Sequence, residues 1–186
     1  NTYTLTYTAG ANGSITGTTP QTVNSGGNGT AVTAVPNAGY HFVQWSDAST
    51  ANPRTDTNVT ANISVTASFA QDQLVFTTQP ANVTRGGALG VVVVTEQDGS
   101  GNTIIDNSSS VDFTIAACGG SVDLGSVTMI DGVATLNSTQ LFYTLTSTPG
   151  LQINASTGTL NGTSQAFNVV ANSDFVFASG FEACRL

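Results

Sequence analysis

The stretch that decides the fold begins Leu74-Val75-Phe76-Thr77-Thr78-Gln79-Pro80 and ends Gln165-Ala166-Phe167-Asn168-Val169-Val170. Between these ends, Gly, Asn, Asp and Ser separate short runs that are rich in β-branched and aromatic residues: Leu89–Thr95, Val111–Ile115, Gly132–Leu136 and Tyr143–Ser147. This spacing is typical of an antiparallel β-sandwich of about a hundred residues. The expected core consists of apolar side chains that two sheets can interdigitate: Phe76, Val92, Val94, Val111, Phe113, Ile115, Val133, Leu136, Tyr143, Leu145, Ile153 and Phe167.

The residues before this stretch predict a smaller β module. Tyr3, Leu5 and Tyr7 alternate with Thr, which is the period of a strand. Further strands are expected at Thr30–Val35, Gly39–Trp45 and Asn62–Ala70, with turns over Ala9–Gly29. The core of this module is expected to contain Tyr3 or Leu5 with Ala34, Phe42, Trp45, Val65 and Phe69. We therefore predict an all-β chain with a module at 1–70, a sandwich at 71–171 and an apolar tail at 172–186, joined at 71–73 by a short, semi-rigid junction.

Composition limits the partners of the chain. Charged residues make up only 8% of the sequence, and the formal net charge is −8. Nucleic acid and anionic membranes are excluded as partners, because phosphate binding requires clustered Lys and Arg. No apolar run is long enough for a transmembrane helix, and the chain starts directly on a strand-like segment. We expect a processed or trimmed form of a secreted protein.

Motifs in the first module are similar to those of a known family: Gly13-Ser14-Ile15, Gly39-Tyr40-x-Phe42-x-x-Trp45-Ser46, Asn52-Pro53 and Val65-Thr66-Ala67-Ser68-Phe69-Ala70. Together they resemble the internalin-type bacterial B-repeat, a small β-grasp-like module. The resemblance implies a spacer or adhesive role on a bacterial surface protein, and it brings no catalytic residue.

Two further resemblances cover the rest of the chain. The motifs Phe76-x-x-Gln79-Pro80, Asp98-x-x-Gly101-Asn102 and Asp131-Gly132-Val133-Ala134-Thr135-Leu136 resemble a bacterial immunoglobulin-like surface domain. That resemblance implies an immunoglobulin-like β-sandwich. The tail motif Asp174-Phe175-Val176-Phe177-x-x-Gly180-Phe181-Glu182 resembles a short C-terminal motif of secreted proteobacterial proteins.

The tail also carries the residues expected to drive assembly. Phe175, Phe177 and Phe181 are costly to leave in water, because burying one such ring contributes roughly 1.5–3 kcal/mol. We expect them to dock on the sandwich, on the first module or on another copy of the chain. Cys118 and Cys184 are predicted to form a disulfide, within one chain or between two, which implies an oxidising, secreted setting.

The sequence offers one candidate metal-binding segment and no catalytic residue. Asp98, Ser100, Asn102 and Asp106 have the oxygen spacing that opens a Ca²⁺ loop, but the later Glu is absent, so we favour a plain hairpin turn. The carboxylates lie on different segments and do not suggest a glycosidase pair: Asp47, Asp56, Asp106, Asp112, Asp123 and Asp131.

Ring side chains are candidates for catalysis and for sugar binding. His41 is the single His, and we do not expect it to act in a catalytic triad. Trp45 is expected in the core, which leaves Tyr3 and Tyr7 as exposed platforms for a sugar ring.

These observations favour an extracellular structural or adhesive protein of the bacterial cell surface, and not an enzyme. We expect no cofactor. The expected partners are other copies of the chain or surface proteins, joined head-to-tail into a filament through the tail or the first strand. The alternative is a non-catalytic carbohydrate- or Ca²⁺-binding accessory module of a larger secreted protein.

Overall fold

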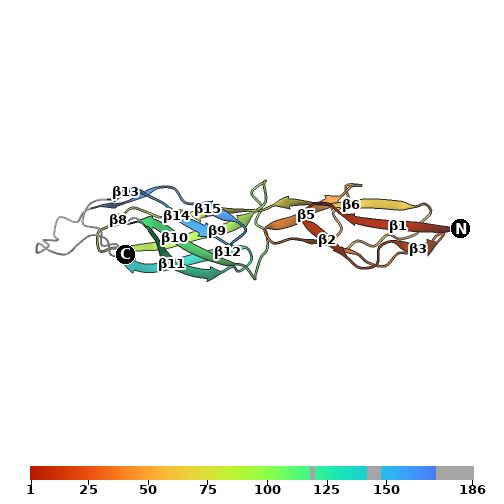
Figure 1. The fold of residues 1–186 in the computed structure, drawn as a ribbon, viewed down its shortest axis with the longest axis horizontal. Helices are drawn as coiled ribbons and strands as arrows, with labels where there is room; N and C mark the ends of the chain where they lie inside the picture. The colour runs from red at the N-terminus through yellow and green to blue at the C-terminus, as the bar shows by residue number, and fades with distance from the viewer. Residues whose placement is uncertain (118–119, 142–147, 171–186) are drawn as a thin grey trace, which may run out of the picture. The chain divides into compact units, whose positions relative to one another are not determined.

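The computed structural model describes residues 1–117, 120–141 and 148–170, and it divides the chain into two compact units after Asp72. In the described residues every regular element is a β-strand (Figure 1), which confirms the all-β prediction. These ranges accordingly contain no helix that could cross a membrane. Each unit has its own hydrophobic core.

β1 (Thr2–Ala9) lies in the interior of the main sheet of the first unit. The sheet order is β3 (Gln21–Asn24), β1, β6 (Ile63–Gln71) and β5 (Tyr40–Trp45). β1 runs parallel to β6 and antiparallel to β3. Since both of its edges are paired, β1 cannot be donated to another chain without dismantling this sheet. The structure therefore argues against the first strand as an assembly element.

The remaining strands of the first unit are β2 (Gly13–Thr16) and β4 (Thr33–Pro36), which pair with each other in antiparallel register. The segment predicted as turns therefore contains two strands, β2 and β3. Each is only four residues long and has a single large apolar side chain, Ile15 in β2 and Val23 in β3. Pairing with β4 and β1 therefore holds these strands in place, because neither has a strong apolar pattern.

The core of the first unit agrees in large part with the sequence. Its buried members are Leu5, Tyr7, Val32, Ala34, Trp45, Val59, Val65 and Ala67, and Phe42 and Phe69 pack against them from partly buried positions. Trp45 is fully buried, as predicted. The prediction of Tyr7 as an exposed sugar platform is wrong, because Tyr7 shares the inward face of β1 with Leu5 and is 3% exposed.

The second unit is a sandwich of two sheets. One sheet has the order β12 (Val133–Leu141), β9 (Ala88–Gln97), β7 (Gln73–Thr78). The other is formed by β11 (Gly120–Thr128), β10 (Ser110–Ala117), β14 (Ile153–Ser156) and β15 (Asn161–Thr163). β13 (Thr148–Leu151) and β16 (Phe167–Val170) pair antiparallel beside it, and β8 (Val83–Thr84) joins β16 in parallel.

The immunoglobulin-like feature of this unit is that its first two strands, β7 and β8, pair in different sheets. β7 pairs with β9 in one sheet, whereas β8, a few residues later, pairs with β16 on the other side. The edge of β7 also lies close to β15, where a methyl group built on Gly162 would come within 2.5 Å of the Leu74 carbonyl oxygen. An antiparallel sandwich with such crossing connections is the predicted fold.

The sandwich core confirms most of the apolar residues named above. Its largest fully buried side chains are Phe113, Phe167, Ile115, Met129, Ile153, Val92, Val94 and Val111. Val133 was wrongly assigned to the core: it is half-buried, and its neighbour Ala134 faces inward with Leu136. Tyr143, Leu145, Cys118, Cys184 and the three tail Phe residues lie outside the described residues.

Candidate functional site

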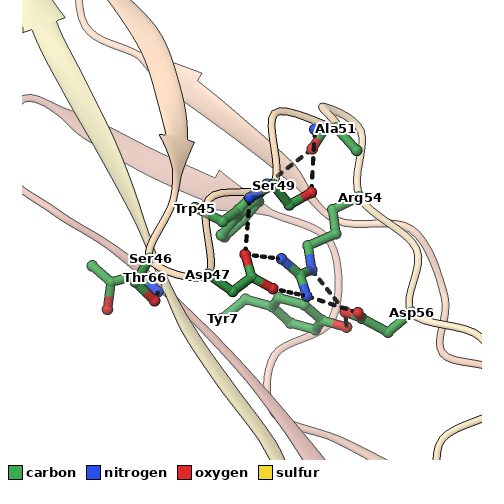
Figure 2. A network of polar contacts seen from close by, with 9 residues as sticks. All are labelled: Tyr7, Trp45, Ser46, Asp47, Ser49, Ala51, Arg54, Asp56 and Thr66. Carbon is green, nitrogen blue, oxygen red and sulfur yellow. Dashed lines mark hydrogen bonds and ion pairs between the residues drawn. The ribbon is translucent and has the colours of Figure 1, made fainter.

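A cluster of polar side chains lies in the segment that connects β5 to β6 (Figure 2). Directly after Trp45 the chain makes a tight turn, in which the Ala48 amide donates to the Trp45 carbonyl at 2.9 Å and Ala48 has a φ of 66°. The segment then runs beside β4, where Arg54 and Val32 exchange backbone hydrogen bonds of 2.8 and 2.9 Å. This backbone bridge fixes the position from which the Arg54 side chain extends.

Arg54 lies between two carboxylates (Figure 2). Its Nε and Nη2 donate to the two oxygens of Asp56 at 2.8 Å each, which is a bidentate contact. Its Nη1 donates to Asp47 Oδ1 at 2.9 Å, and Nη2 lies 2.8 Å from Asp47 Oδ2. The Arg54 side chain is 7% exposed, against 15% for Asp56 and 44% for Asp47. Asp56 is therefore the partner that shares the burial of the cation.

Two aromatic side chains complete the cluster. The Tyr7 hydroxyl donates to Asp56 Oδ2 at 2.7 Å. The guanidinium carbon of Arg54 lies 5.6 Å from the centroid of the Trp45 ring, within the range of a cation–π contact. The Trp45 indole N–H donates to the Ala51 carbonyl at 2.9 Å. The connecting segment is thus attached to the core by three contacts, one with Tyr7 and two with Trp45.

The charges in the cluster shift its ionisation in a consistent direction. Hydrogen bonds from Arg54 hold the pKa of Asp56 and the pKa of Asp47 below their usual values, despite partial burial. The same carboxylates raise the pKa of Arg54. Burial raises the pKa of the Tyr7 hydroxyl above its usual value, and its hydrogen bond to Asp56 adds to that rise. All four groups therefore keep their ordinary neutral-pH charge states.

The arrangement acts as a clamp. The Arg54 cation is held by two carboxylates, so it is not available to a bound anion, and both carboxylates are held by Arg54. Sequence reasoning placed Asp47 and Asp56 on separate segments and missed this grouping. The signal present in the sequence is the pattern Arg54-x-Asp56 in a chain with only three Lys and Arg residues in total.

A shallow surface depression of about 410 Å³ lies next to the cluster, over β5, β6 and the turn that follows β1. Its lining residues are Gly10, Ala11, Asn12, Gln44, Trp45, Ser46, Thr66, Ala67, Ser68 and Phe69. Two of its hydroxyl groups form hydrogen bonds with other residues that line the depression. Ser46 Oγ accepts from the Thr66 amide, and Ser68 Oγ donates to the Gln44 carbonyl. Trp45 is fully buried and offers no exposed ring for stacking.

The weak Ca²⁺ candidates form two separate turns. Asp98 Oδ1 accepts from the Ser100 and Asn102 amides at 2.8 Å, and Asp98 Oδ2 accepts from the Asn102 side chain at 2.9 Å. Asp106 instead accepts from the amides of Ser108 and Ser109. Burial alone would raise the pKa of Asp106, but the hydrogen bonds from these serines lower it overall. In the described residues no group of His, Cys, Asp and Glu has the arrangement of a metal site.

His41 is placed against the last residue of the first unit. Its Nδ1 lies 2.5 Å from Asp72 Oδ1, and the Asp72 side chain is only 2% exposed. The Asp72 amide also donates to the Gly39 carbonyl at 2.9 Å. The pair therefore ties the end of β6 to the edge strand β5.

The first unit matches a known family of domains. Residues 3–73 match the divergent InlB B-repeat domain. The match confirms the predicted resemblance and covers the first unit almost from end to end. A search of curated proteins finds no match to the chain. The B-repeat match indicates a module of a bacterial surface or extracellular protein.

The geometry explains why the B-repeat motif residues stand where they do. Gly13 lies under the Phe69 ring, where a methyl group would come within 2.3 Å of the ring carbons. The Asn52 side chain accepts from the Ala34 amide and donates to the Ala34 carbonyl, both at 2.8 Å. Gly39 has a φ of 76°, which favours glycine in the turn before β5.

Proposed function

We propose that this chain is a non-catalytic structural or adhesive segment of a bacterial surface protein, and that its copies join head-to-tail into a filament. The observation that carries the proposal is the B-repeat unit, which is joined directly to an immunoglobulin-like sandwich. Both are modules whose stability comes from sheet pairing and core packing. Only Asp72 separates β6, the last strand of the first unit, from β7, the first strand of the second.

The contacts of the titratable side chains support a structural role. Asp47 and Asp56 bind Arg54, and Asp72 binds the His41 ring. Asp98 and Asp106 each close their own turn. These groups hold backbone segments in place, and satisfied polar networks of this kind make a module rigid.

Head-to-tail assembly is proposed to use the C-terminal tail. Because β1 is already paired on both edges, we assign the assembly contact to the tail and not to β1. Three Phe residues within seven positions, Phe175, Phe177 and Phe181, give the tail a large apolar area to bury. A contact between the tail of one copy and a different surface of the next does not close, and it therefore grows a filament.

The experiment compares the intact chain with a variant that lacks residues 172–186 and with the triple variant Phe175→Ser, Phe177→Ser, Phe181→Ser. Electron microscopy and light scattering are recorded with and without reductant. The proposal expects polymers from the intact chain and none from either variant. Polymers of equal length from all three proteins would rule out the tail as the assembly element.

A second candidate function is a carbohydrate-binding accessory module. The observation that favours it is the depression beside β5 and β6, which has the size of a small-ligand site and polar side chains from Asn12, Gln44 and Ser46. Titration calorimetry with soluble glycans tests it. Specific heat that disappears in Gln44→Ala would support this function, and absence of heat would leave the structural role alone.

A further inference from the structure

The two outer faces of the sandwich differ in chemistry. The outer face of β10, β11 and β14 carries polar and acidic side chains: Ser110, Asp112, Thr114, Ser126, Asn154 and Ser156. Several bond one another, as when Ser126 Oγ donates to Asp112 Oδ1 at 2.6 Å. This face has the composition expected of a solvated sheet surface.

The outer face of β12, β9 and β7 is instead built from β-branched side chains. Val133, Thr95 and Val75 form one row across the three strands, and Thr135 pairs with Val93 and Asn137 with Val91 in the next two rows. Thr77 lies at a bulge in β7, where its hydroxyl is 3.1 Å from that of Thr95. We call these eight residues the Val/Thr face. It contains no charged residue, and Val91 is 51% exposed. Val75, Val93 and Val133 are half-buried and so are partly in contact with solvent, whereas Thr95 is buried, with 6% of its surface exposed.

We propose that the Val/Thr face is a self-association surface, which packs side by side against the same face of a second copy of the chain. Sheets of β-branched residues stack face to face at about 10 Å in sandwich cores, and two such faces can interdigitate in the same way. A contact between identical faces is related by a twofold axis.

Charge favours a second copy as the occupant. Each chain carries a formal charge of −8, so two copies repel each other over most of their surface. The Val/Thr face has no charged residue of its own, and two copies meet there with the least repulsion. A cationic partner would instead be attracted to the face that carries Asp112.

The size of the face sets the strength of the contact. Three strands about 4.8 Å apart, over about five residues each, give roughly 250 Å² per copy. Stable dimers bury about 800 Å² per partner, so a single contact is weak in dilute solution. It becomes effective where copies are already concentrated, as in a filament or at a cell surface. The inference therefore rests on the proposed structural role and adds a lateral contact to it.

The test measures the mass of the full-length chain in reductant by sedimentation equilibrium, from about 10 μM to about 1 mM, the range of a weak interface. The proposal expects reversible dimers that strengthen at higher salt, because salt screens the repulsion between the copies. Val91→Asp should weaken dimerisation by about tenfold or more, since it places a charge in each of two facing surfaces. Asn154→Asp adds the same charge to the opposite face and should leave dimerisation unchanged.

The outcomes separate this inference from the head-to-tail filament. A chain that stays monomeric at all concentrations, or that dimerises equally in Val91→Asp, overturns the Val/Thr face. An equal loss in Val91→Asp and Asn154→Asp also overturns it, because net charge alone would then explain the effect. If only removal of residues 172–186 abolishes association, the tail filament stands and the Val/Thr face falls. If Val91→Asp alone abolishes it and no polymer forms, the Val/Thr face stands and the tail filament falls.

Discussion

Replacement of Arg54 by Met removes the cation from the clamp and keeps most of the volume of the side-chain stem. The Arg54 side chain is 7% exposed and Asp56 is 15% exposed, so the variant leaves a largely buried carboxylate without its partner. Breaking a buried pair in this way costs about 3–5 kcal/mol. Because the cluster lies at the margin of the unit, we expect a loss near the lower value, about 3 kcal/mol. In a domain of this size such a loss lowers Tm by about 12 °C or more.

The assay is denaturant unfolding followed by the emission of Trp45. The chain has a single Trp, fully buried in the first unit, so its emission reports that unit alone. Asp47→Asn is the matched control: Asp47 is 44% exposed, and an exposed pair contributes about 1 kcal/mol or less. Adding Asp56→Asn to the Arg54→Met variant should restore part of the loss, because it removes the unpaired charge. A loss below 1 kcal/mol in Arg54→Met, or an equal loss in Asp47→Asn, would refute the clamp.

Three further predictions concern the first unit. Arg54 lowers the pKa of Asp56 and of Asp47, so the stability they contribute is complete above the unfolded value of about 3.9 and is lost as pH falls through their lower folded values. The unfolding free energy followed by Trp45 should therefore drop steeply below about pH 4, and Arg54→Met should flatten that drop. Gly13→Ala should destabilise the unit by about 1–3 kcal/mol, since the new methyl overlaps the Phe69 ring, and Phe69→Leu should relieve part of the loss in a double-mutant cycle. His41→Phe should cost about 1–3 kcal/mol by leaving the buried Asp72 carboxylate without its ring partner, and Asp72→Asn in the same background should recover stability in thermal melts.

Strands with an unbroken alternation could be predicted from the sequence. β1 is such a strand and keeps Leu5 and Tyr7 on one face. β9 was predicted instead from its run of four Val residues, of which Val92 and Val94 face inward. β11 was missed because a bulge breaks its period: Val122 and Leu124 lean on the core, and after Gly125, with a φ of 115°, so does Val127. Alternation also fails to show which side chains point inward where a strand has apolar residues at both odd and even positions. Val133 and Leu136 are three residues apart and cannot share one face of a strand, and the structure assigns the inward face to Leu136.

The Arg54 cluster could not be read from the sequence because loop geometry creates it. Asp47 and Asp56 are nine positions apart, and only the turn at Ala48 and the backbone bridge to Val32 bring both carboxylates to one guanidinium. The same holds for His41 and Asp72, which meet across the β5–β6 pair. The burial of Trp45 could be predicted from the resemblance to the B-repeat and not from alternation, because a bulge between Phe42 and Gln44 breaks the period of β5.

The native mass of the unreduced protein tests head-to-tail assembly most directly. Light scattering on the intact chain should give a species many times larger than 18.9 kDa. Its collapse on reduction would place Cys118 and Cys184 between subunits, and its persistence would assign the contacts to the tail. A monomer of 18.9 kDa both with and without reductant would contradict the filament.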